Sequence, residues 1–255
     1  MADGVETYRR SFARRSAAMA EADQTALDQP GICGVLGSAQ FPGGRVLITD
    51  DRAVPTLEAL LPDLLVGILN VFEDASRCRE LIEQAGRWSG QEAMAMICPD
   101  LHTVPVLAVP AGLTIRTVRR SQTDAADGIP LEEAARACLA AEPDAGSDEL
   151  PGFVEFLWSL PPTTRLLAAV DDQNVVRATS GSSAFGVEAN AYFVSTDEHW
   201  RGRGIATAMT ASALAWAREA GASQASLDSS QAGLSIYLRL GFQPVSRARL
   251  FTRFS

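Results

Sequence analysis

The sequence predicts an α+β fold in two parts, and three observations lead to that prediction. Segments with the helical spacing of apolar residues alternate with short apolar segments of the kind that form strands. A proline-rich and nearly uncharged segment, residues 104–112, divides the chain. After this segment the elements follow in the order β-α-α-β-β-β-α-β-α-β. Helices and strands therefore occur in both parts, and the second part has the clearer pattern.

The first part, residues 1–110, is expected to be the smaller α+β domain and to be non-catalytic. We find no catalytic constellation among its residues. Its predicted elements are a helix over about 5–27, a hairpin over 31–50 that turns at 42–44, helices over 56–70 and 74–85, and a strand over 92–101.

The second part, residues 111–255, is expected to hold the functional site. Proline stands near the start of each of its first two helices, as is common at a helix N-terminus, and Gly221 marks the end of the third. The predicted elements are a strand over 114–120, helices over 129–142 and 151–160, a hairpin over 165–185 that turns at 171–174, a strand over 188–196, a helix over 206–220, a strand over 223–230, a short helix over 233–241 and a strand pair over 242–254.

The composition is that of an ordinary soluble globular protein, with 47% hydrophobic and 21% charged residues. The longest apolar stretches are too short to span a bilayer. The arginines near the N-terminus are not followed by the apolar core of a secretory signal. We therefore expect a cytoplasmic protein without a membrane partner, either a monomer or a homodimer.

Metal ions and nucleic acids are not expected as partners. The four cysteines are widely spaced without a Cys-x-x-Cys pair, and the two histidines are far apart, so no metal site is predicted. The net charge of −9 argues against nucleic acid, because phosphate binding needs a positive surface.

The charge is unevenly distributed along the second part. Residues 124–155 hold nine acidic residues against one arginine, whereas residues 201–255 hold seven arginines against two acidic residues. The acidic segment could attract a cation and the arginine-rich segment an anion. The alternative for the acidic segment is a set of solvated helix faces.

The most informative segment lies between the strand over 188–196 and the helix over 206–220. It reads Arg201-Gly202-Arg203-Gly204-Ile205-Ala206. A helix N-terminus has unpaired N–H groups and a partial positive charge, so it can bind an anion. Small residues let a phosphate approach the backbone, and Arg203 could add charge beside it.

This segment resembles the (Gln/Arg)-x-x-Gly-x-(Gly/Ala) signature of the GNAT superfamily of N-acyltransferases. A second segment, Tyr237-Leu238-Arg239-Leu240-Gly241-Phe242, is similar to the Tyr-x-x-Leu-Gly-Phe segment of that superfamily and stands at the usual distance. The resemblance covers residues 113–254. It implies the GNAT fold, a mixed and mostly antiparallel sheet flanked by helices, and an acyl-CoA-dependent N-acyltransferase, most simply an N-acetyltransferase.

The resemblance also implies the roles of individual residues. Acetyl-CoA or another acyl-CoA would be the co-substrate, with its pantetheine paired to the strand backbone at a β-bulge and its pyrophosphate held by the loop and the start of the helix. Tyr237 would act as the general acid for the departing thiolate. The residues implied for the acyl-CoA are Val194, Ser195, Thr196, Arg201, Gly202, Arg203, Gly204, Ile205, Ala206, Thr207 and Ser230.

Two positions depart from the pattern of the superfamily. Ser230 stands where an asparagine is common, and Ala225 stands where a glutamate often serves as general base. Asp228, Glu155 or a water relay could take the place of that base. The first part resembles a degenerate copy of the same fold without the phosphate-binding glycines, which would shape the acceptor site or an interface.

The acceptor is expected to be an amine of a small molecule, and the acidic segment favours a cationic one. This expectation depends on the acidic residues Asp144, Asp148 and Glu149, between two helices that line the acceptor entrance in the superfamily. Phe153, Phe156 and Trp158 could add an apolar wall, although core packing is the alternative for them. A different class of function also stays open, that of a non-catalytic acyl-CoA-binding or sensing protein. A nicotinamide site is disfavoured, because Gly202-x-Gly204 lacks the third glycine of the dinucleotide fingerprint.

Overall fold

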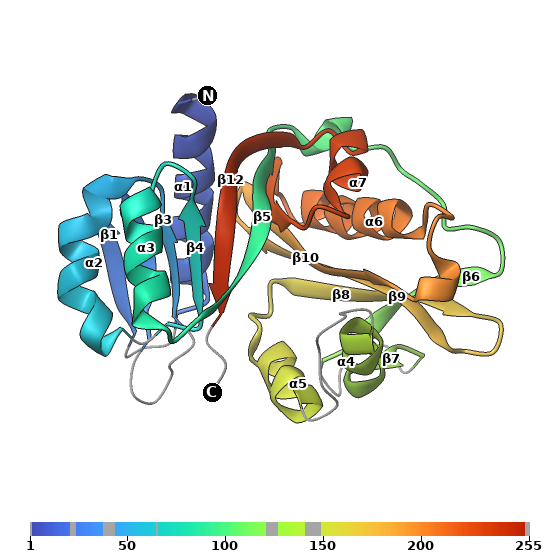
Figure 1. The fold of residues 1–255 in the computed structure, drawn as a ribbon. Helices are drawn as coiled ribbons and strands as arrows, with labels where there is room; N and C mark the ends of the chain where they lie inside the picture. The colour runs from blue at the N-terminus through green and yellow to red at the C-terminus, as the bar shows by residue number, and fades with distance from the viewer. Residues whose placement is uncertain are drawn as a thin grey trace. The chain divides into compact units, whose positions relative to one another are not determined.

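The computed structural model describes residues 2–20, 24–37, 44–64, 66–120, 127–140 and 149–252. The chain forms two compact units, and each is described separately. The first unit comprises residues 1–97, 226–235 and 242–255, and the second comprises residues 98–225 and 236–241. The order of the elements along the chain can be followed by colour in Figure 1.

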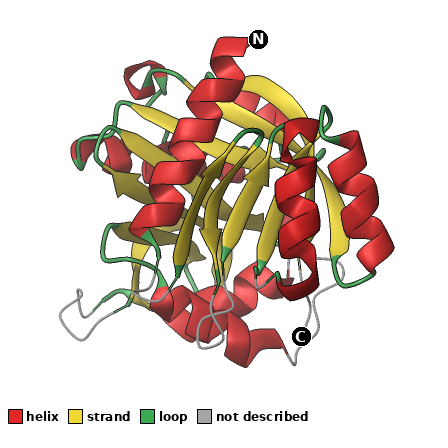
Figure 2. Cartoon of the chain, turned by 90° about the vertical axis from the view of Figure 1, so that its left-hand side faces the viewer, coloured by secondary structure: helices red, strands yellow, loops and turns green. Residues whose placement is uncertain are grey.

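The first unit is a sheet with helices on both of its faces (Figure 2). Its strands follow the order β1-β2-β3-β4-β12-β5-β11. The β3–β4 pair is parallel, whereas β1–β2, β2–β3, β4–β12 and β12–β5 are antiparallel. The elements are α1 (Ala2–Ala18), β1 (Thr25–Gln29), β2 (Ile32–Leu36), β3 (Arg45–Ile48), α2 (Val54–Leu60), β4 (Ile68–Phe72), α3 (Ser76–Ala85), β5 (Ser89–Cys98), β11 (Gln224–Ser229), which enters this unit at Ser226, and β12 (Gln243–Thr252).

Alternation along the strands produces two separate cores in the first unit. Cys33, Leu47 and Phe72 face α1, where they pack with Tyr8 and Phe12. The neighbouring strand residues face the other way and pack against α2 and α3, together with buried side chains of those helices. Because successive side chains of a strand point to opposite faces, the central strands of this sheet contribute to both cores.

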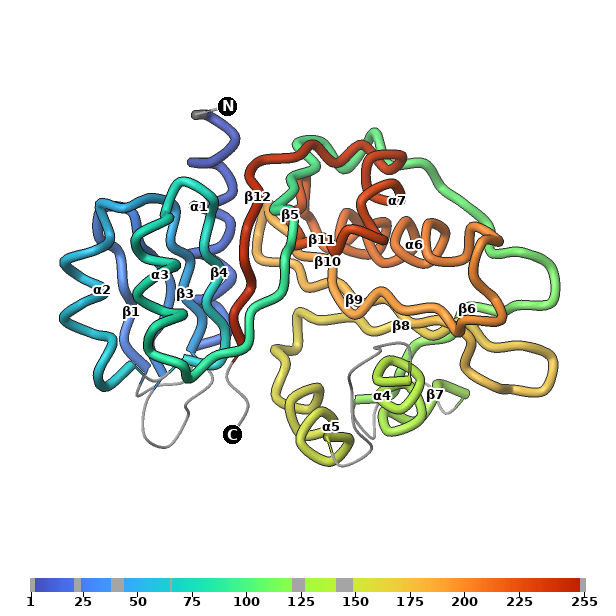
Figure 3. The backbone as a smooth tube through the Cα atoms, in the orientation of Figure 1, coloured from blue at the N-terminus to red at the C-terminus, as the bar shows by residue number. Residues whose placement is uncertain are grey.

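The last strand of the chain completes the sheet of the first unit. Strand β12 lies between β4 and β5 and pairs with both of them, as Figure 3 shows. Its Phe251 is 1% exposed and belongs to the core beside α2 and α3. A segment about 150 residues farther along the sequence therefore supplies part of the core of the first unit.

The second unit is built on the strand order β10-β9-β8-β6-β7. The β6–β8, β8–β9 and β9–β10 pairs are antiparallel, and β6–β7 is a short parallel pair. Figure 1 shows α6 on one side of these strands and α4 with α5 on the other. The elements are β6 (Leu113–Arg119), β7 (Ile129–Pro130), α4 (Leu131–Ala140), α5 (Leu150–Ser159), β8 (Thr164–Asp171), β9 (Val176–Phe185), β10 (Glu188–Thr196), α6 (Ile205–Glu219) and α7 (Leu234–Arg239), which belongs to this unit from Ile236 onward.

Helix α6 lies close to the sheet because small residues meet at their interface. Ala213 on the helix and Ala178 on β9 belong to one buried cluster with Ile205 and Met209. Alanine leaves little side chain between helix and strand, so the backbones approach closely. This packing fixes the N-terminus of α6 directly after the end of β10.

The structure confirms most predicted elements of the second part and corrects three predicted elements of the chain. The predicted helix over 5–27 ends at Ala18, and Thr25–Gln29 is instead strand β1, because pairing with β2 overrides the local helical preference. The predicted helix over 56–70 ends at Leu60, and a 3₁₀-turn containing Pro62 follows it. Ile68–Phe72 is strand β4, since a short buried apolar run does not distinguish strand from helix.

The third correction concerns the end of the chain. The predicted strand pair over 242–254 is the single strand β12 with an irregularity between Pro244 and Ser246. The two compact units have other bounds than the domains 1–110 and 111–255, which stay a prediction: residues 98–110 lie in the second unit, and residues 226–235 and 242–255 lie in the first. The predicted turn at residues 42–44 lies largely outside the described residues.

We predict that Phe251→Ala destabilises the first unit, although residue 251 stands near the end of the chain. Loss of this buried ring should reduce the free energy of unfolding by about 3–5 kcal/mol. Hydrogen exchange should show reduced protection in β4, with which β12 pairs. Val187→Ala is the control, since Val187 is 52% exposed and should change stability by no more than about 0.5 kcal/mol. Unchanged protection of β4 in the Phe251→Ala variant would contradict the prediction.

Candidate functional site

The candidate site begins at a break in the hydrogen-bonding register between β9 and β10. Tyr192 pairs with Gly181 and Ser195 with Thr179, so three residues of β10 advance against two of β9. Phe193, inside this bulge, has a positive φ of 54°. A bulky residue rarely adopts a left-handed conformation, because its Cβ crowds the backbone. The bulge predicted beside Val194–Thr196 is therefore present, and it is strained.

Aromatic packing and one hydroxyl group hold the bulge in place. The Phe193 ring makes edge-to-face contacts with Phe153 and Phe156 of α5 and with Tyr192, at centroid distances of 5.4, 6.0 and 4.8 Å. Thr179 donates a hydrogen bond of 2.8 Å to the Phe193 carbonyl oxygen, and its hydroxyl lies 2.7 Å from that of Ser195. The contacts with α5 show that at least Phe153 and Phe156 serve as packing residues.

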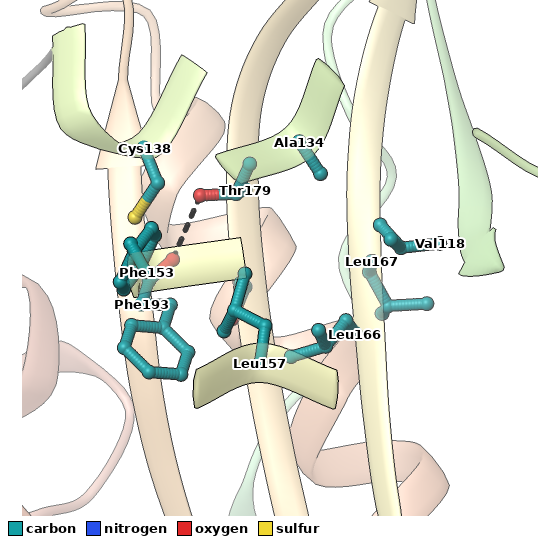
Figure 4. A pocket seen from close by; sticks show the side chains of 10 residues that line it. Val118, Ala134, Cys138, Phe153, Leu157, Leu166, Leu167, Thr179 and Phe193 are labelled. Carbon is teal, nitrogen blue, oxygen red and sulfur yellow. Dashed lines mark hydrogen bonds between the residues drawn. The ribbon is translucent and has the colours of Figure 1, made fainter. Parts of the chain in front are cut away.

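A small apolar pocket lies beside the bulge (Figure 4). Its free space is about 20 Å³, which is room for roughly one water molecule or methyl group. The pocket lies between α4, α5 and the sheet, and its lining is Val118, Ala134, Cys138, Phe153, Leu157, Leu166, Leu167, Thr179, Ser180 and Phe193. It can therefore accept a small apolar group and offers no charged side chain.

The segment after β10 leads directly into α6. Gly202 and Gly204 have φ values of 76° and 79°, and a Cβ at either position would meet no atom within 4 Å. Left-handed backbone, rather than lack of space, is thus what requires glycine here. Gly204 is the N-cap of α6 and has no side chain to cap the helix. The N–H groups at the start of α6, which include those of Ile205, Ala206 and Thr207, are available to an anion.

The arginines of this loop are tied to nearby backbone. Arg201 donates through Nε to the Thr196 carbonyl oxygen at 3.1 Å, and Arg203 donates through Nη2 to the His199 carbonyl oxygen at 3.2 Å. Thr207 accepts from Arg239 of α7 at 3.4 Å. The end of β10, the loop, the start of α6 and the later residues of α7 therefore form one connected region of the second unit.

Tyr237 lies on α7 in this region and is only 8% exposed. Burial raises the pKa of its hydroxyl group to about 12. The hydroxyl consequently keeps its proton at neutral pH and can donate a hydrogen bond or a proton. This state is the one that a general acid requires.

The structure places Asp228 and Ser230 in the first unit. Asp228 Oδ1 accepts hydrogen bonds from the Tyr8 hydroxyl at 2.7 Å and from Asn70 Nδ2 at 2.8 Å, and Arg15 lies 4.0 Å from Oδ2. The Asp228 side chain therefore connects α1, β4 and β11. Ser230 Oγ accepts from the Gly233 backbone N–H at 3.3 Å.

Other predicted features can be placed only in part. Asp144 and Asp148 lie outside the described residues, whereas Glu149 is exposed and precedes α5. Trp158 is 51% exposed on α5. Within the described ranges no group of three or more His, Cys, Asp or Glu side chains could hold a metal ion. None of the helices in those ranges has the length and apolar character needed to cross a membrane.

Sequence reasoning missed a cluster around Trp200, which lies in the 3₁₀-helix η5 (Glu198–Trp200) just before the loop. The guanidinium groups of Arg177 and Arg203 lie 5.4 and 4.8 Å from the centre of its ring. The Asp197 side chain caps η5, and an aspartate before a short helix is a recognisable signal. The position of Arg177 on β9 carries no such signal, because the contact depends on tertiary structure.

Residues 162–244 match the family model described as "Acetyltransferase (GNAT) domain". The comparison with curated proteins gave no match. Solved structures with a similar fold include a GCN5-related N-acetyltransferase from Kribbella flavida, with a TM-score of 0.62 and 18% identity over 97% of this chain and 95% of that one.

Two further solved structures resemble the whole chain. A GCN5-related N-acetyltransferase-like protein from Streptococcus suis gives a TM-score of 0.55 with 15% identity over 100% of both chains. A tandem GNAT protein from the clavulanic acid biosynthesis pathway gives 0.52 with 13% identity over 98% of this chain and 94% of that one. At these identities the likeness shows the fold, and it is consistent with a GNAT-like first part.

We predict that glycine is more stabilising than alanine at position 193, which is the reverse of the usual order within a strand. Phe193→Gly and Phe193→Ala both remove the ring, but only glycine relieves the positive φ, so the Gly variant should be the more stable by about 1 kcal/mol. Tyr192→Gly and Tyr192→Ala form the control pair, since Tyr192 has no positive φ and glycine should there be the less stable by about 0.5–1 kcal/mol. Urea unfolding of the four variants measures both differences. If the Gly variant is less stable than the Ala variant at position 193, as it is expected to be at position 192, Phe193 is not strained.

Proposed function

We propose that this chain, whose residues 162–244 match the GNAT acetyltransferase domain model, transfers an acyl group from coenzyme A to an amine of a small molecule. The simplest donor is acetyl-CoA. The observation that carries the proposal is the continuous course of bulged strand, left-handed glycine loop and uncapped helix in the second unit. Each of these features leaves backbone groups available, and an acyl-CoA is a ligand that could use all of them.

The acyl-CoA is proposed to bind mainly to backbone. The amides of its pantetheine would pair with the backbone of Val194, Ser195 and Thr196, at and directly after the bulge, which interrupts the pairing with β9 between Tyr192 and Ser195. Its pyrophosphate would accept hydrogen bonds from the N–H groups of residues 202–207, favoured by the dipole of α6. Arg201 and Arg203 would add positive charge beside this anion.

The proposed reaction is a direct attack in a ternary complex. The neutral amine nitrogen attacks the thioester carbonyl carbon, a C–N bond forms, and the C–S bond breaks. The departing sulfur takes a proton from the Tyr237 hydroxyl. An ordinary thiol is more acidic than a phenol, but a thiolate that forms in a desolvated site is less stable than in water. Desolvation therefore raises the proton affinity of the departing thiolate, and burial raises that of Tyr237 in the same direction.

Three groups are candidates for receiving the proton of the amine: Asp228, Glu155 and a water molecule. Asp228 already accepts hydrogen bonds from Tyr8 and Asn70, which favours a role in holding the first unit together. Glu155 is exposed on α5 in the second unit. Water is the third candidate, since Ala225, at the position of the superfamily's glutamate, is buried and carries no ionisable group.

The acceptor is proposed to be a small-molecule amine. The apolar pocket beside the bulge supports an acceptor, or an acyl group, with a small apolar portion. A cationic acceptor remains a prediction from the acidic segment, of which residues 124–126 and 141–148 lie outside the described residues. The absence of a carboxylate at Ala225 favours the second candidate function, that of an acyl-CoA-binding protein without turnover. Release of free CoA in the presence of a panel of amines distinguishes the two.

We predict that Gly204→Glu weakens the binding of acetyl-CoA by about tenfold or more. Position 204 requires left-handed backbone, which glutamate adopts less readily than glycine. The new carboxylate would also lie where a phosphate must approach, and repulsion at short range costs several kcal/mol. Gly86→Glu is the matched control, because Gly86 also has a positive φ of 63° and open space, but lies after α3 in the first unit. Calorimetric titration should show normal affinity in the control. Equal affinities in the two folded variants would refute the assignment.

We predict that Tyr237→Phe lowers kcat about 10²- to 10⁴-fold while acetyl-CoA affinity changes little, because only the proton donor is removed. Burial raises the pKa of Tyr237 to about 12, so the protonated, active form persists at neutral and mildly alkaline pH. The rate of the unaltered protein should therefore not fall through ionisation of this residue below about pH 11. Single-turnover measurements across pH test both statements, and undiminished turnover in the Phe variant would exclude the role.

A further inference from the structure

Trp200 connects the loop over 201–204 to Arg177 on strand β9 of the sheet. Its side chain is half-buried against the cluster formed by Ile205, Met209 and their neighbours under α6. The ring also lies within 6 Å of the guanidinium groups of Arg177 and Arg203. A guanidinium group within this distance of a tryptophan ring is attracted to its face. Trp200 can therefore determine where both cations lie.

The two arginines differ in how their charge is balanced. Arg177 donates through Nε to Asp171 and through Nη1 to Asp197, each at 2.8 Å. These bonds raise the pKa of Arg177. Asp197 also accepts the His199 backbone N–H at 3.0 Å and so fixes η5. Arg177 thus joins the β8–β9 hairpin to the start of η5, and the two carboxylates neutralise its charge.

Arg203 has no such partner. Its contacts are the Trp200 ring and the His199 carbonyl oxygen, and no carboxylate within the described part of the chain forms an ion pair with it. The side chain is exposed and belongs to the residue immediately before Gly204, the N-cap of α6. An arginine that is positioned by a ring but not neutralised is prepared to bind an anion.

We propose that Trp200 is a positioning residue that holds the Arg203 guanidinium as a ligand for a phosphate group of coenzyme A. This inference rests on the proposed function, since it assumes that an acyl-CoA occupies the loop. The backbone N–H groups at the start of α6 serve the pyrophosphate, and the 3′-phosphate of coenzyme A is a second possible ligand of Arg203. Holding the side chain before binding reduces the conformational entropy lost on binding.

Two substitutions of Trp200 separate the aromatic face from apolar bulk. Trp200→Leu keeps an apolar side chain but removes the ring, and it should weaken binding of CoA about three- to tenfold, as expected for loss of a cation–π contact at a partly exposed site. Trp200→Phe keeps a ring and should restore most of the affinity. Titration calorimetry of the full chain with CoA, 3′-dephospho-CoA and pantetheine provides the measurement.

The three ligands report on different parts of the site. Pantetheine carries no phosphate, so its affinity should be unchanged in Trp200→Leu. A loss that is equal for CoA and 3′-dephospho-CoA assigns Arg203 to the pyrophosphate, whereas a loss confined to CoA assigns it to the 3′-phosphate. An equal loss for pantetheine would mean that Trp200 only supports the fold, and the proposal would be wrong.

A double-mutant cycle tests whether Trp200 acts through Arg203. Arg203→Gln alone should weaken CoA binding, and adding Trp200→Leu should cause little further loss, because the two changes remove one interaction. Additive losses would overturn the proposal. If Trp200→Leu does not fold, Arg203→Lys at the exposed position 203 replaces it as the test. This variant keeps the positive charge but loses the planar guanidinium group. CoA affinity equal to that of the unaltered protein would then overturn the proposal. If the unaltered protein binds no CoA, the proposed function fails instead.

Discussion

The break in pairing between β9 and β10 is the constraint on which the arrangement of the second unit depends. In a regular strand at this place, Val194 would keep its position in the hydrogen-bonded pairing of β10 with β9. The extra residue turns that backbone away, at the cost of a left-handed phenylalanine. Helix α5 meets that cost, because Phe153 and Phe156 pack on the Phe193 ring and keep it in place. These two rings of the helix thus support the site by packing alone.

The loop and α6 extend the same principle, because in the proposed site the backbone would recognise the acyl-CoA and side chains mainly position that backbone. The alanines of α6 let it lie close to β9, and this closeness sets the helix N-terminus at the end of β10. Arg201 and Arg203 are tied to carbonyl oxygens of the same turn. Such a site tolerates many side-chain changes but few backbone ones, which explains why glycines mark it in the sequence.

Sequence reasoning reached the second part of the chain better than the first. Gly202 and Gly204 next to a long alanine-rich helix, with Tyr237 at a fixed distance, predict local structure from local signals. Strand β10 and helix α6 lie where they were expected. The positive φ at Phe193 and the Arg177–Trp200 contact had no local signal, since both arise from packing between elements far apart in the chain. The predicted helix over 56–70 includes the first residues of β4 for a related reason, because the neighbouring strands β3 and β12 decide the conformation of β4.

The insertion of β12 between β4 and β5 also has a consequence for synthesis on the ribosome. Protein domains commonly fold in the order in which they are translated, at about 5–20 residues per second. Here the first unit reaches Ile97 but still lacks the strand that ends at Thr252. At those rates the facing edges of β4 and β5 wait about 8–30 seconds for their partner. During translation they are open strand edges of the kind that invite aggregation, so the sheet of the first unit depends on the later strand β12 to close it.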